Sequence, residues 1–447
     1  MKPLGWFGIV RLGMVQTALG AIVVLTTSTM NRVMVVELAL PAMLPGVLVG
    51  LHYAIQLLRP RLGYGSDVGG RRTPWIIGGL AILATGGVLA SLAISWMSTQ
   101  TAAGIALAAL AFALIGVGVG ASGTTLLVLL AQRVAEERRP AAATITWLMM
   151  VAGFVVTAAI AGQMLDPYSP ARLVAVTAGV SLTALLVTVI AVWRVEGPRP
   201  AAPRERTPDT RRTAAPFRAV LIEVWGEPAA RRFTVFVFLS MLAYSLQDLI
   251  LEPYAGLVFG LTPGESTQLA SVQHGGVMLG MIVVALAGSA IGGRILGSMR
   301  FWIVGGCIAS AAALLGLALG AFAPGWPLRA NVFALGAANG AFAVAAIGSM
   351  MTLASQGTGQ RAGLRIGLWG ASQAIAFGVG GVLGTLASDV ARWLLHSPEV
   401  AYASVFTGEA VLFLLAAVLA LRLALPAPRV GAARRVSLSP FTSLARR

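Results

Sequence analysis

Residues 52–75, with the sequence HYAIQLLRPRLGYGSDVGGRRTPW, decide the fold. One apolar segment ends there, a short loop flanked by four arginines follows, and the next apolar segment begins. Apolar segments of about 20 residues are long enough to cross the hydrocarbon core of a bilayer. The stretch therefore predicts two membrane helices joined on one side of the membrane by a basic loop, with His52 inside the first helix.

Similar apolar segments recur along the whole chain of 447 residues, of which 57% are hydrophobic and only 11% charged. The mean hydropathy is +0.84, whereas soluble proteins carry about 25% charged residues. We predict an all-α integral membrane protein whose first apolar run is retained, because it has full length and lacks a cleavage site. Twelve transmembrane helices are expected, at about residues 9–31, 41–61, 74–96, 102–131, 141–164, 172–194, 232–255, 266–291, 301–323, 329–354, 365–388 and 400–424.

Basic residues are distributed unevenly between the two sides of this topology. The net charge is +16, and 28 of the 32 lysines and arginines fall on one side. Positively charged loops stay in the cytoplasm, so the asymmetry predicts that both termini are cytoplasmic. Topology in membrane lipid explains the charge, and we expect no nucleic-acid partner. The lone cysteine, Cys307, excludes a disulfide or a cysteine metal cluster within one chain.

A segment rich in proline, arginine and threonine, residues 195–231, interrupts the apolar pattern. Its composition cannot form a core, which predicts a cytoplasmic linker. We therefore divide the chain into a six-helix bundle at 1–194, the linker, a second six-helix bundle at 232–425, and a basic cytoplasmic tail at 426–447.

The two predicted bundles match each other at a constant offset in residue number, which is 222. Duplicated segments keep such an offset, so we predict two parallel repeats, which is the major facilitator architecture. The matched pairs are Pro41 and Pro263, His52 and His274, Arg72 and Arg294, Arg139 and Arg361, Trp147 and Trp369, and Gly162 and Gly384.

The loop within the opening stretch resembles the signature loop between helices 2 and 3 of the major facilitator superfamily, G-x-x-x-D-x-x-G-R-R. Its fixed positions are filled by Gly63, Asp67, Gly70, Arg71 and Arg72. The resemblance implies a structural loop that helps to control conformational change. The alternative is a plain basic connector.

Several further strings resemble the bacteriochlorophyll delivery (PucC/LhaA-like) family of that superfamily. They are Asn31–Leu38, Leu51–Tyr53, Gln247–Tyr254, Arg361–Gly363 and Gly367–Ala374. The resemblance implies a protein of a bacterial cytoplasmic or intracytoplasmic photosynthetic membrane that handles bacteriochlorophyll or a late precursor. Light-harvesting subunits or bacteriochlorophyll synthase are the implied partners. The loop at residues 63–72 is shorter than in PucC and LhaA, which indicates another branch of the family.

Two histidines are candidate pigment ligands. His52 lies eleven residues after Pro41, or roughly 16 Å along a helix, and His274 lies eleven after Pro263. Imidazole is a suitable axial ligand for the magnesium of a pigment, and an ionisable residue within the membrane is a functional candidate. The alternative is a hydrogen bond between helices.

Flat side chains could contact a porphyrin-like ring. The candidates are Trp147, Trp369 and Gln373, the last of which lies one helical turn after Trp369. Aromatic residues in membrane helices also serve as packing residues or interface anchors. Packing or anchoring is therefore the alternative role for both tryptophans.

Four charged residues are predicted at similar depth on helices 1 and 7: Arg32, Glu37, Asp248 and Glu252. A lone charge inside the membrane is costly, so we predict an ion pair of Arg32 with Asp248 or Glu252 that closes the outer side. The alternatives are a proton-coupling carboxylate and simple exposure at the membrane interface.

The sequence contains few polar residues with which to bind a hydrophilic solute. We therefore expect a carrier or assembly factor that delivers pigment, and not an enzyme, since no phosphate loop, nucleophile–base pair or metal-ligand cluster is evident. The pigment is the expected cargo, with no tightly bound cofactor and no direct metal site. The alternatives are a proton-coupled secondary transporter of a small solute and a membrane scaffold without a ligand.

Overall fold

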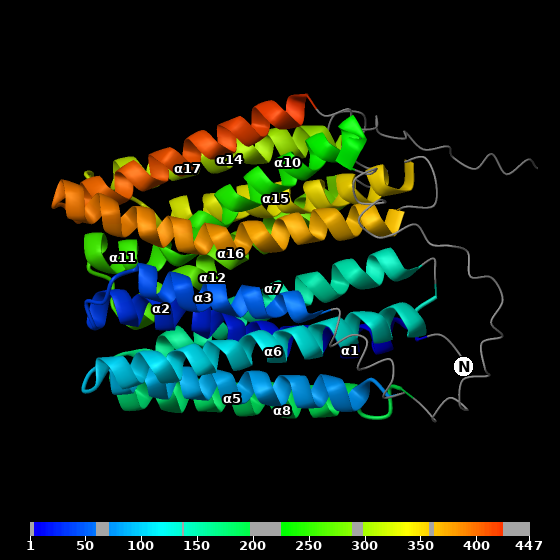
Figure 1. Cartoon of the computed structure of the whole chain (residues 1–447), viewed down its shortest axis with the longest axis horizontal. Helices are drawn as coiled ribbons and strands as arrows, with labels where there is room; N and C mark the ends of the chain where they lie inside the picture. Colours follow the sequence, from blue (N-terminus) through cyan, green and yellow to red (C-terminus); the bar gives the residue numbers. More distant parts are fainter. Residues whose placement is uncertain are drawn as a thin grey trace, which may run out of the picture.

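The computed structural model describes residues 4–59, 71–135, 138–196, 225–287, 298–356 and 362–422, and these residues contain helices and no strand. Helices run side by side along the length of the molecule (Figure 1). The first half of the chain supplies α1 (Trp6–Val24), α2 (Met30–Arg32), α3 (Met43–Ile55), α5 (Thr73–Met97), α6 (Thr101–Arg133), α7 (Arg139–Leu165) and α8 (Pro170–Val192). The second half supplies α10 (Pro228–Leu246), α11 (Leu251–Phe259), α12 (Pro263–Ala287), α14 (Met299–Gly320), α15 (Leu328–Gln356), α16 (Ala362–Leu395) and α17 (Pro398–Leu421).

Each of the predicted membrane segments contains a helix, so the all-α membrane fold class is confirmed. Ten helices of the described residues are long and apolar enough to cross a membrane, and the bent pair Ala230–Leu249 and Leu251–Phe259 makes an eleventh. The apolar helix Met43–Leu58 is shorter. The count of twelve spans therefore stays a prediction, as does the division into four segments. Most of the linker, residues 197–224, and the tail at 426–447 lie outside the described residues.

The first helix continues beyond its predicted end at residue 31. Two π-helical turns, Leu25–Thr29 and Val33–Glu37, extend it to Glu37. In the second of these turns the amide of Leu38 donates to the carbonyl of Val33 at 3.0 Å. A π turn brings residues five apart onto one face of the helix.

The seventh membrane helix is broken near its end. It turns by 40° between Leu249 and Leu251. Pro253 lacks an amide N–H, so it cannot donate to the carbonyl of Leu249 four residues earlier. The side-chain amide of Asn31 donates to that carbonyl at 2.5 Å instead. A residue of the first half thus satisfies a backbone group that the break leaves free.

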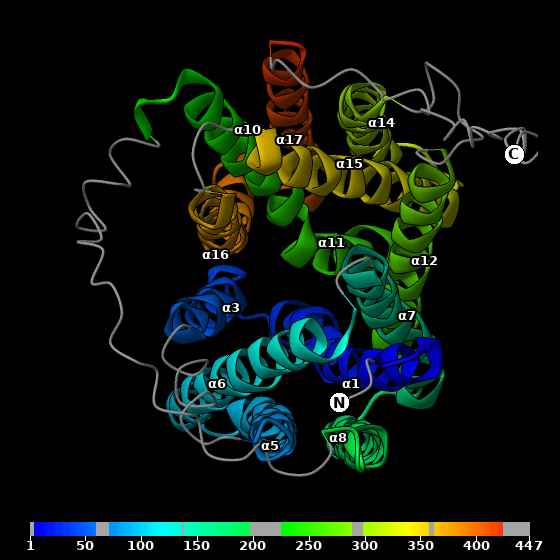
Figure 2. The same cartoon turned by 90° about the vertical axis from the view of Figure 1, so that its right-hand side faces the viewer.

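The two halves meet along two pairs of helices, α7 with α12 and α3 with α16. Figure 2, a view along the helices, has each pair side by side and α11 between the two pairs. We call these two contacts the α7–α12 seam and the α3–α16 seam. Small residues permit the close approach that membrane helices need. At Gly46 on α3, for example, an added Cβ would collide with Thr385 of α16.

The bundle has two ends. We call the end at which α1 begins and α17 finishes the proximal end, and the opposite end the distal end. The distal end carries the turns around residues 38–42, 166–169, 259–262 and 396–397. The core of the second half is rich in aromatic side chains; its fully buried members include Phe233, Phe236, Tyr254, Phe342, Phe406 and Phe413.

Candidate functional site

Arg32 lies buried where the two halves meet near the distal end, with only 2% of its surface exposed. Its Nε donates to Ser266 Oγ at 3.1 Å, and its Nη2 donates to the carbonyl oxygen of Leu261. Its Nη1 forms an ion pair with Glu37. The guanidinium therefore ties the end of the first helix to the turn before α12 and to the first turns of that helix.

The prediction that Arg32 forms an ion pair with Asp248 or Glu252 was wrong. Among the described residues, Arg32 has no ion pair with Asp248 or Glu252 and pairs with Glu37 instead. The π turn Val33–Glu37 is the reason, because it brings positions five apart together. A helix with 3.6 residues per turn would point the two side chains apart.

Glu252 lies in the same buried region but has a different partner. One of its carboxyl oxygens accepts a hydrogen bond from the hydroxyl of Ser28, and the other has none among the described residues. Beside it, the hydroxyls of Thr29 and Thr267 lie 2.9 Å apart. Polar pairs of this kind hold membrane helices together. Hydroxyl groups of the first membrane helix thus contact α11 and α12 near the distal end, and the predicted closure of the outer side stays a prediction.

Tyr168 lies in the distal turn close to the Arg32–Glu37 pair. Burial, followed by the charge of Glu37, raises the pKa of Tyr168 to about 12. The phenol therefore remains protonated and neutral beside the ion pair.

Asp248 is partly buried and has no ion pair or hydrogen bond within the described part of the chain. It lies within electrostatic range of Tyr53 and Tyr244. Aromatic rings connect these elements across the α3–α16 seam. The ring centroid of Phe377 is 5.9 Å from that of Tyr53 and 5.6 Å from that of Tyr244. Phe377 and Tyr244 are absent from the sequence-based candidates, because nothing in a lone aromatic residue says which helix it faces.

His52 is buried on α3 beside Tyr53, and its ring is already hydrogen-bonded. Its Nε2 lies 2.7 Å from Nε2 of Gln56. Gln56 Oε1 accepts from Arg59, so the amide nitrogen of Gln56 is the donor to His52. His52 Nε2 is therefore the acceptor and Nδ1 carries the proton, with no partner among the described residues. His52 has no free lone pair in this arrangement.

His274 is half-buried on α12, and its hydrogen bond differs from that of His52. Its Nδ1 lies 2.8 Å from the carbonyl oxygen of Ala270, which can only accept, so Nδ1 carries the proton. The lone pair of Nε2 remains available, with no hydrogen bond in the described residues. Such a backbone bond on one ring nitrogen is how proteins orient a ligating histidine. Phe154 packs edge-on against the ring at a centroid distance of 4.9 Å.

The two tryptophans have different environments. Trp147 on α7 is 40% exposed, whereas Trp369 on α16 is 1% exposed. The Trp369 ring packs edge-on against Phe233 at a centroid distance of 4.7 Å. A pigment ring could not stack on Trp369 without displacing this core contact. Gln373, one turn further on α16, is half-buried.

Only part of the signature loop can be placed. Gly63, Asp67 and Gly70 lie outside the described residues. Arg71 is exposed, and the backbone amide of Arg72 donates to Oε1 of Glu196, which follows α8. The other oxygen of Glu196 accepts from the amide and the hydroxyl of Thr73, each at 2.9 Å. The end of the loop is thus fixed to the segment that follows α8.

Two buried polar residues of the second half do not belong to the predicted site. Glu409 on α17 is 2% exposed, and neither carboxyl oxygen has a hydrogen-bond partner in the described residues. It lies within electrostatic range of Asp248. The side-chain amide of Gln247 is also fully buried without a partner there. An acidic residue inside a 24-residue apolar segment was a signal that could have found Glu409.

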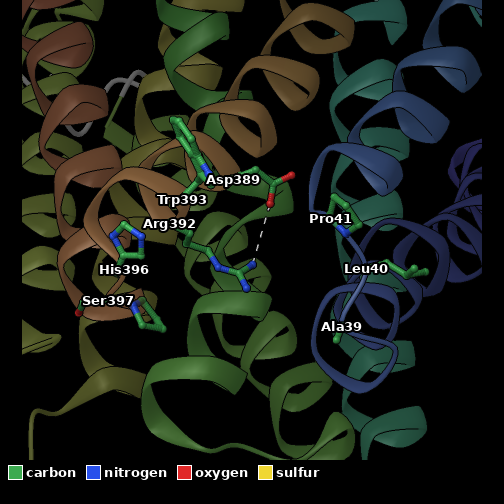
Figure 3. A pocket seen from close by; sticks show the side chains of 9 residues that line it. Ala39, Leu40, Pro41, Asp389, Arg392, Trp393, His396 and Ser397 are labelled. Atoms are coloured by element: carbon green, nitrogen blue, oxygen red, sulfur yellow. Dashed lines mark ion pairs between the residues drawn. The ribbon is translucent and has the colours of Figure 1, made fainter.

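A pocket of about 540 Å³ opens at the distal end, between the turn at Ala39–Pro41 and the end of α16. In Figure 3 the turn faces Asp389, and Arg392 approaches Asp389 from the same helix. Arg392 Nη1 is 3.9 Å from Asp389 Oδ1. Within the described residues there is no group of three or more His, Cys, Asp or Glu side chains suited to hold a metal ion.

Known proteins of similar fold include transporters. The structure of a bacterial homolog to the human lysosomal transporter Spinster, inward-facing and occupied, superposes with a TM-score of 0.68 at 15% identity, covering 93% of this chain and 96% of that one. The peptide transporter POT in complex with sulfate superposes with a TM-score of 0.68 at 16% identity, covering 96% and 97%. At such identity the similarity is one of fold, and the fold is that of the major facilitator superfamily.

Sequence relatives cover nearly the whole chain. The family model described as "PUCC protein" matches residues 29–427. The chain is 51% identical over 417 residues to the bacteriochlorophyll synthase 44.5 kDa chain of Rhodobacter capsulatus, covering 93% of this chain and 95% of the relative. It is 31% identical to protein PucC of Rhodobacter capsulatus, covering 85% and 83%. The predicted family is confirmed: the chain belongs to the PucC family.

Proposed function

We propose that this protein binds bacteriochlorophyll or a late precursor within the membrane and delivers it to light-harvesting apoproteins or to enzymes of pigment synthesis. The observation that carries the proposal is the 51% identity, over 93% of the chain, with a protein named bacteriochlorophyll synthase 44.5 kDa chain. Membership of the PucC family supports the same cargo.

Two histidines on the seam helices are the candidate ligands for the magnesium of the pigment. His274 supports it best, because its Nδ1–H bond to Ala270 leaves the Nε2 lone pair free for a pigment magnesium. His52 could contribute only after Gln56 releases its Nε2. Trp147 is 40% exposed and lies on α7, about two helical turns before Phe154, so it offers a flat surface on the helix that packs against His274.

A role as carrier or assembly factor fits the family and fold better than a role in catalysis. The word synthase in the name of the relative is compatible with a subunit that presents pigment to an enzyme. We accordingly propose a non-enzymatic protein whose partners are light-harvesting subunits or bacteriochlorophyll synthase. An apolar macrocycle needs one ligand and aromatic surfaces, and few hydrogen bonds.

The proposed location is a bacterial cytoplasmic or intracytoplasmic photosynthetic membrane. The proximal end, which carries Arg72, Arg133 and Arg422 among the described residues, would face the cytoplasm with both termini. The distal end would then face the outside. Protease accessibility of epitope tags at either terminus, in sealed vesicles of known orientation, tests this orientation.

Purification in a mild detergent from the pigment-producing host tests the cargo. The proposal expects bacteriochlorophyll or precursor absorbance in the purified protein and co-purification of a synthesis enzyme or light-harvesting subunit, identified by mass spectrometry. Protein that is monodisperse but colourless, when prepared from pigmented membranes, would contradict the proposal.

A second candidate is a proton-coupled transporter of a small solute. It is favoured by two buried carboxyl groups, since Glu252 and Glu409 each have an oxygen without a partner among the described residues. Uptake of solute into proteoliposomes that depends on an imposed proton gradient would support this candidate. Pigment binding without such uptake would favour the carrier.

A further inference from the structure

Two aspartates cross the seams between the halves at the distal end. Asp389 of α16 accepts hydrogen bonds from the backbone amides of Ala42, at 2.9 Å, and Met43, at 2.7 Å. Asp166, at the end of α7, accepts from the backbone amide of Gly264 at 3.2 Å. Each carboxylate therefore sits at the first turn of a helix that belongs to the other half of the chain.

The two arrangements are equivalent by the internal repeat. The acceptor helices begin at matched positions, since Ala42 and Gly264 are related by the same offset of 222 that relates the two bundles. Asp166 and Asp389 are related by an offset of 223. One contact lies in the α7–α12 seam and the other in the α3–α16 seam. The same contact thus occurs twice, once on each side of the molecule.

The offset of 223 also corrects an alignment made from the sequence. Gly162 packs against Gln268, and Thr385 packs against Gly46. Because Gly46 and Gln268 are matched at the offset of 222, the structural mate of Gly162 is Thr385, and not Gly384. Helices α7 and α16 are therefore shifted by one position relative to the rest of the repeat in this region.

The physical reason for these contacts is the free N-terminus of a helix. The first amides of a helix have no partner within it and carry the positive end of the helix dipole. A carboxylate placed there makes charge-assisted hydrogen bonds, which are stronger than neutral ones. Since Asp166 and Asp389 come from the opposite half, this stabilisation exists only while the two halves touch.

A small residue gives the carboxylate of Asp166 its access. A Cβ added to Gly264 would collide with the carboxylate of Asp166 and with the carbonyl of Gly162. Thr262, just before α12, adds a hydrogen bond from its hydroxyl to the carboxylate of Asp166 at 2.7 Å. On the other seam, Arg392 lies 3.9 Å from Asp389 within α16 itself.

We propose that Asp166 and Asp389 are a pair of symmetric latches that hold the distal ends of the two halves together, and that both must release before the distal side opens. The inference rests on the seams and does not depend on which cargo is carried. It is therefore separable from the proposed function: a colourless protein could still have working latches.

A cysteine reporter between the two halves measures the opening. Thr267 of α12 is fully buried and faces Thr29 of the first membrane helix, so Thr267→Cys reacts with a maleimide only when the distal side opens. The variants are Asp166→Ala, Asp389→Ala and both together. When opening and closing are faster than labelling, the labelling rate follows the open population. Each single aspartate variant should raise the labelling rate of Thr267→Cys about fivefold. The double variant should raise it about 25-fold, as expected for the loss of two independent helix caps.

Glu265 provides the matched control. Its carboxylate accepts from the amide of Thr262 at 2.9 Å, at the start of the same α12, but both residues belong to one half. Glu265→Ala should leave the labelling rate of Thr267→Cys within about twofold of the parent, because no contact across a seam is lost. An increase equal to that of Asp166→Ala would overturn the latch.

The native cysteine separates opening from unfolding. Cys307 is buried in the core of the second half, so it should stay unlabelled in the double aspartate variant without the reporter. Labelling of Thr267→Cys that stays at the parental rate in the double variant, while Cys307 remains protected, would refute the proposal. Fast labelling of Cys307 would show that the double variant unfolds globally. The labelling rates of Thr267→Cys in the two single aspartate variants, compared with that in Glu265→Ala, then test the proposal.

Discussion

Asn31 and Leu249 form the contact that joins the break of one helix to the end of another. The side-chain amide of Asn31 donates to the backbone carbonyl of Leu249 at 2.5 Å, across the two halves. That carbonyl is free because Pro253 has no N–H with which to close the helical bond. In a membrane, a backbone group without a partner costs several kcal/mol, so a break is tolerated only where a neighbour supplies the bond.

A double-mutant cycle tests this relationship. Asn31→Ala should lower the free energy of unfolding by about 1–3 kcal/mol, because the Leu249 carbonyl loses its donor. Pro253→Ala restores a local N–H, so the loss caused by Asn31→Ala should be smaller in that background. Denaturant unfolding in detergent, followed by tryptophan fluorescence, measures both. Equal losses of stability in the two backgrounds would show that Asn31 does not compensate for the N–H that Pro253 lacks.

The pairing of Arg32 predicts the result of a charge swap. Arg32→Glu should destabilise the protein by about 3 kcal/mol, since it sets two carboxylates side by side in a buried region. Adding Glu37→Arg should recover part of that loss, whereas adding Asp248→Arg should recover none. Thermal melting of the three variants is the measurement. If Asp248→Arg recovers the stability lost in Arg32→Glu and Glu37→Arg does not, Arg32 pairs with Asp248, as the sequence suggested, and not with Glu37.

The sequence was sufficient for the fold class and the family, because both depend on apolar length and on long strings such as Gln247–Tyr254. It was insufficient for the partner of Arg32, which depends on a π turn that no periodicity of 3.6 residues reveals. The shift from 222 to 223 between the repeats is likewise invisible in an ungapped alignment. Trp147 and Trp369 are matched only at the offset of 222, and Trp147 is 40% exposed whereas Trp369 packs against Phe233 in the core, so the ungapped match does not say which way a side chain faces.

The two histidines should respond differently to substitution. His274→Leu should reduce co-purifying pigment strongly, since it removes the imidazole whose Nε2 is free, whereas His52→Leu should reduce it less. Gln56→Leu should raise the pigment content of the His274→Leu variant by releasing Nε2 of His52. The ratio of pigment to protein absorbance measures all three.

The third histidine serves as the control for that series. His396 lies in the distal turn with φ of 54°, so His396→Asn preserves a backbone conformation that asparagine tolerates. Its pigment content should equal that of the parent. A pigment ratio that stays unchanged in His274→Leu would remove the ligand role of His274.

Substitutions of the two tryptophans should have different effects, one on stability and the other on pigment content. Trp369→Leu should lower the free energy of unfolding by about 3 kcal/mol, because it leaves a cavity against Phe233 in the core. Trp147→Leu should change stability by less than about 0.5 kcal/mol but reduce pigment if the exposed ring contacts the cargo. Unfolding and pigment absorbance are measured on the same preparations. A larger stability loss at Trp147 than at Trp369 would contradict the structure.

Glu409 distinguishes the carrier from the proton-coupled transporter. Its carboxyl group is buried on α17 without a hydrogen-bond partner among the described residues, which costs stability. Glu409→Met, an apolar replacement of similar volume, should therefore raise the free energy of unfolding by about 1–3 kcal/mol. Glu399, on the same helix at the distal end, is the control, because its carboxylate accepts from Ser397 at 2.5 Å and Glu399→Met should not stabilise.

Functional assays of Glu409→Met then distinguish the two candidate roles of the protein. If the protein carries pigment and Glu409 serves no proton transfer, Glu409→Met should keep the parental pigment content together with its added stability. If the protein couples transport to protons through Glu409, the same variant should lose proton-driven uptake while remaining stable. A Glu409→Met variant that is less stable than the parent would contradict the isolation of this carboxyl group, and would point to a partner that binds it in the folded protein.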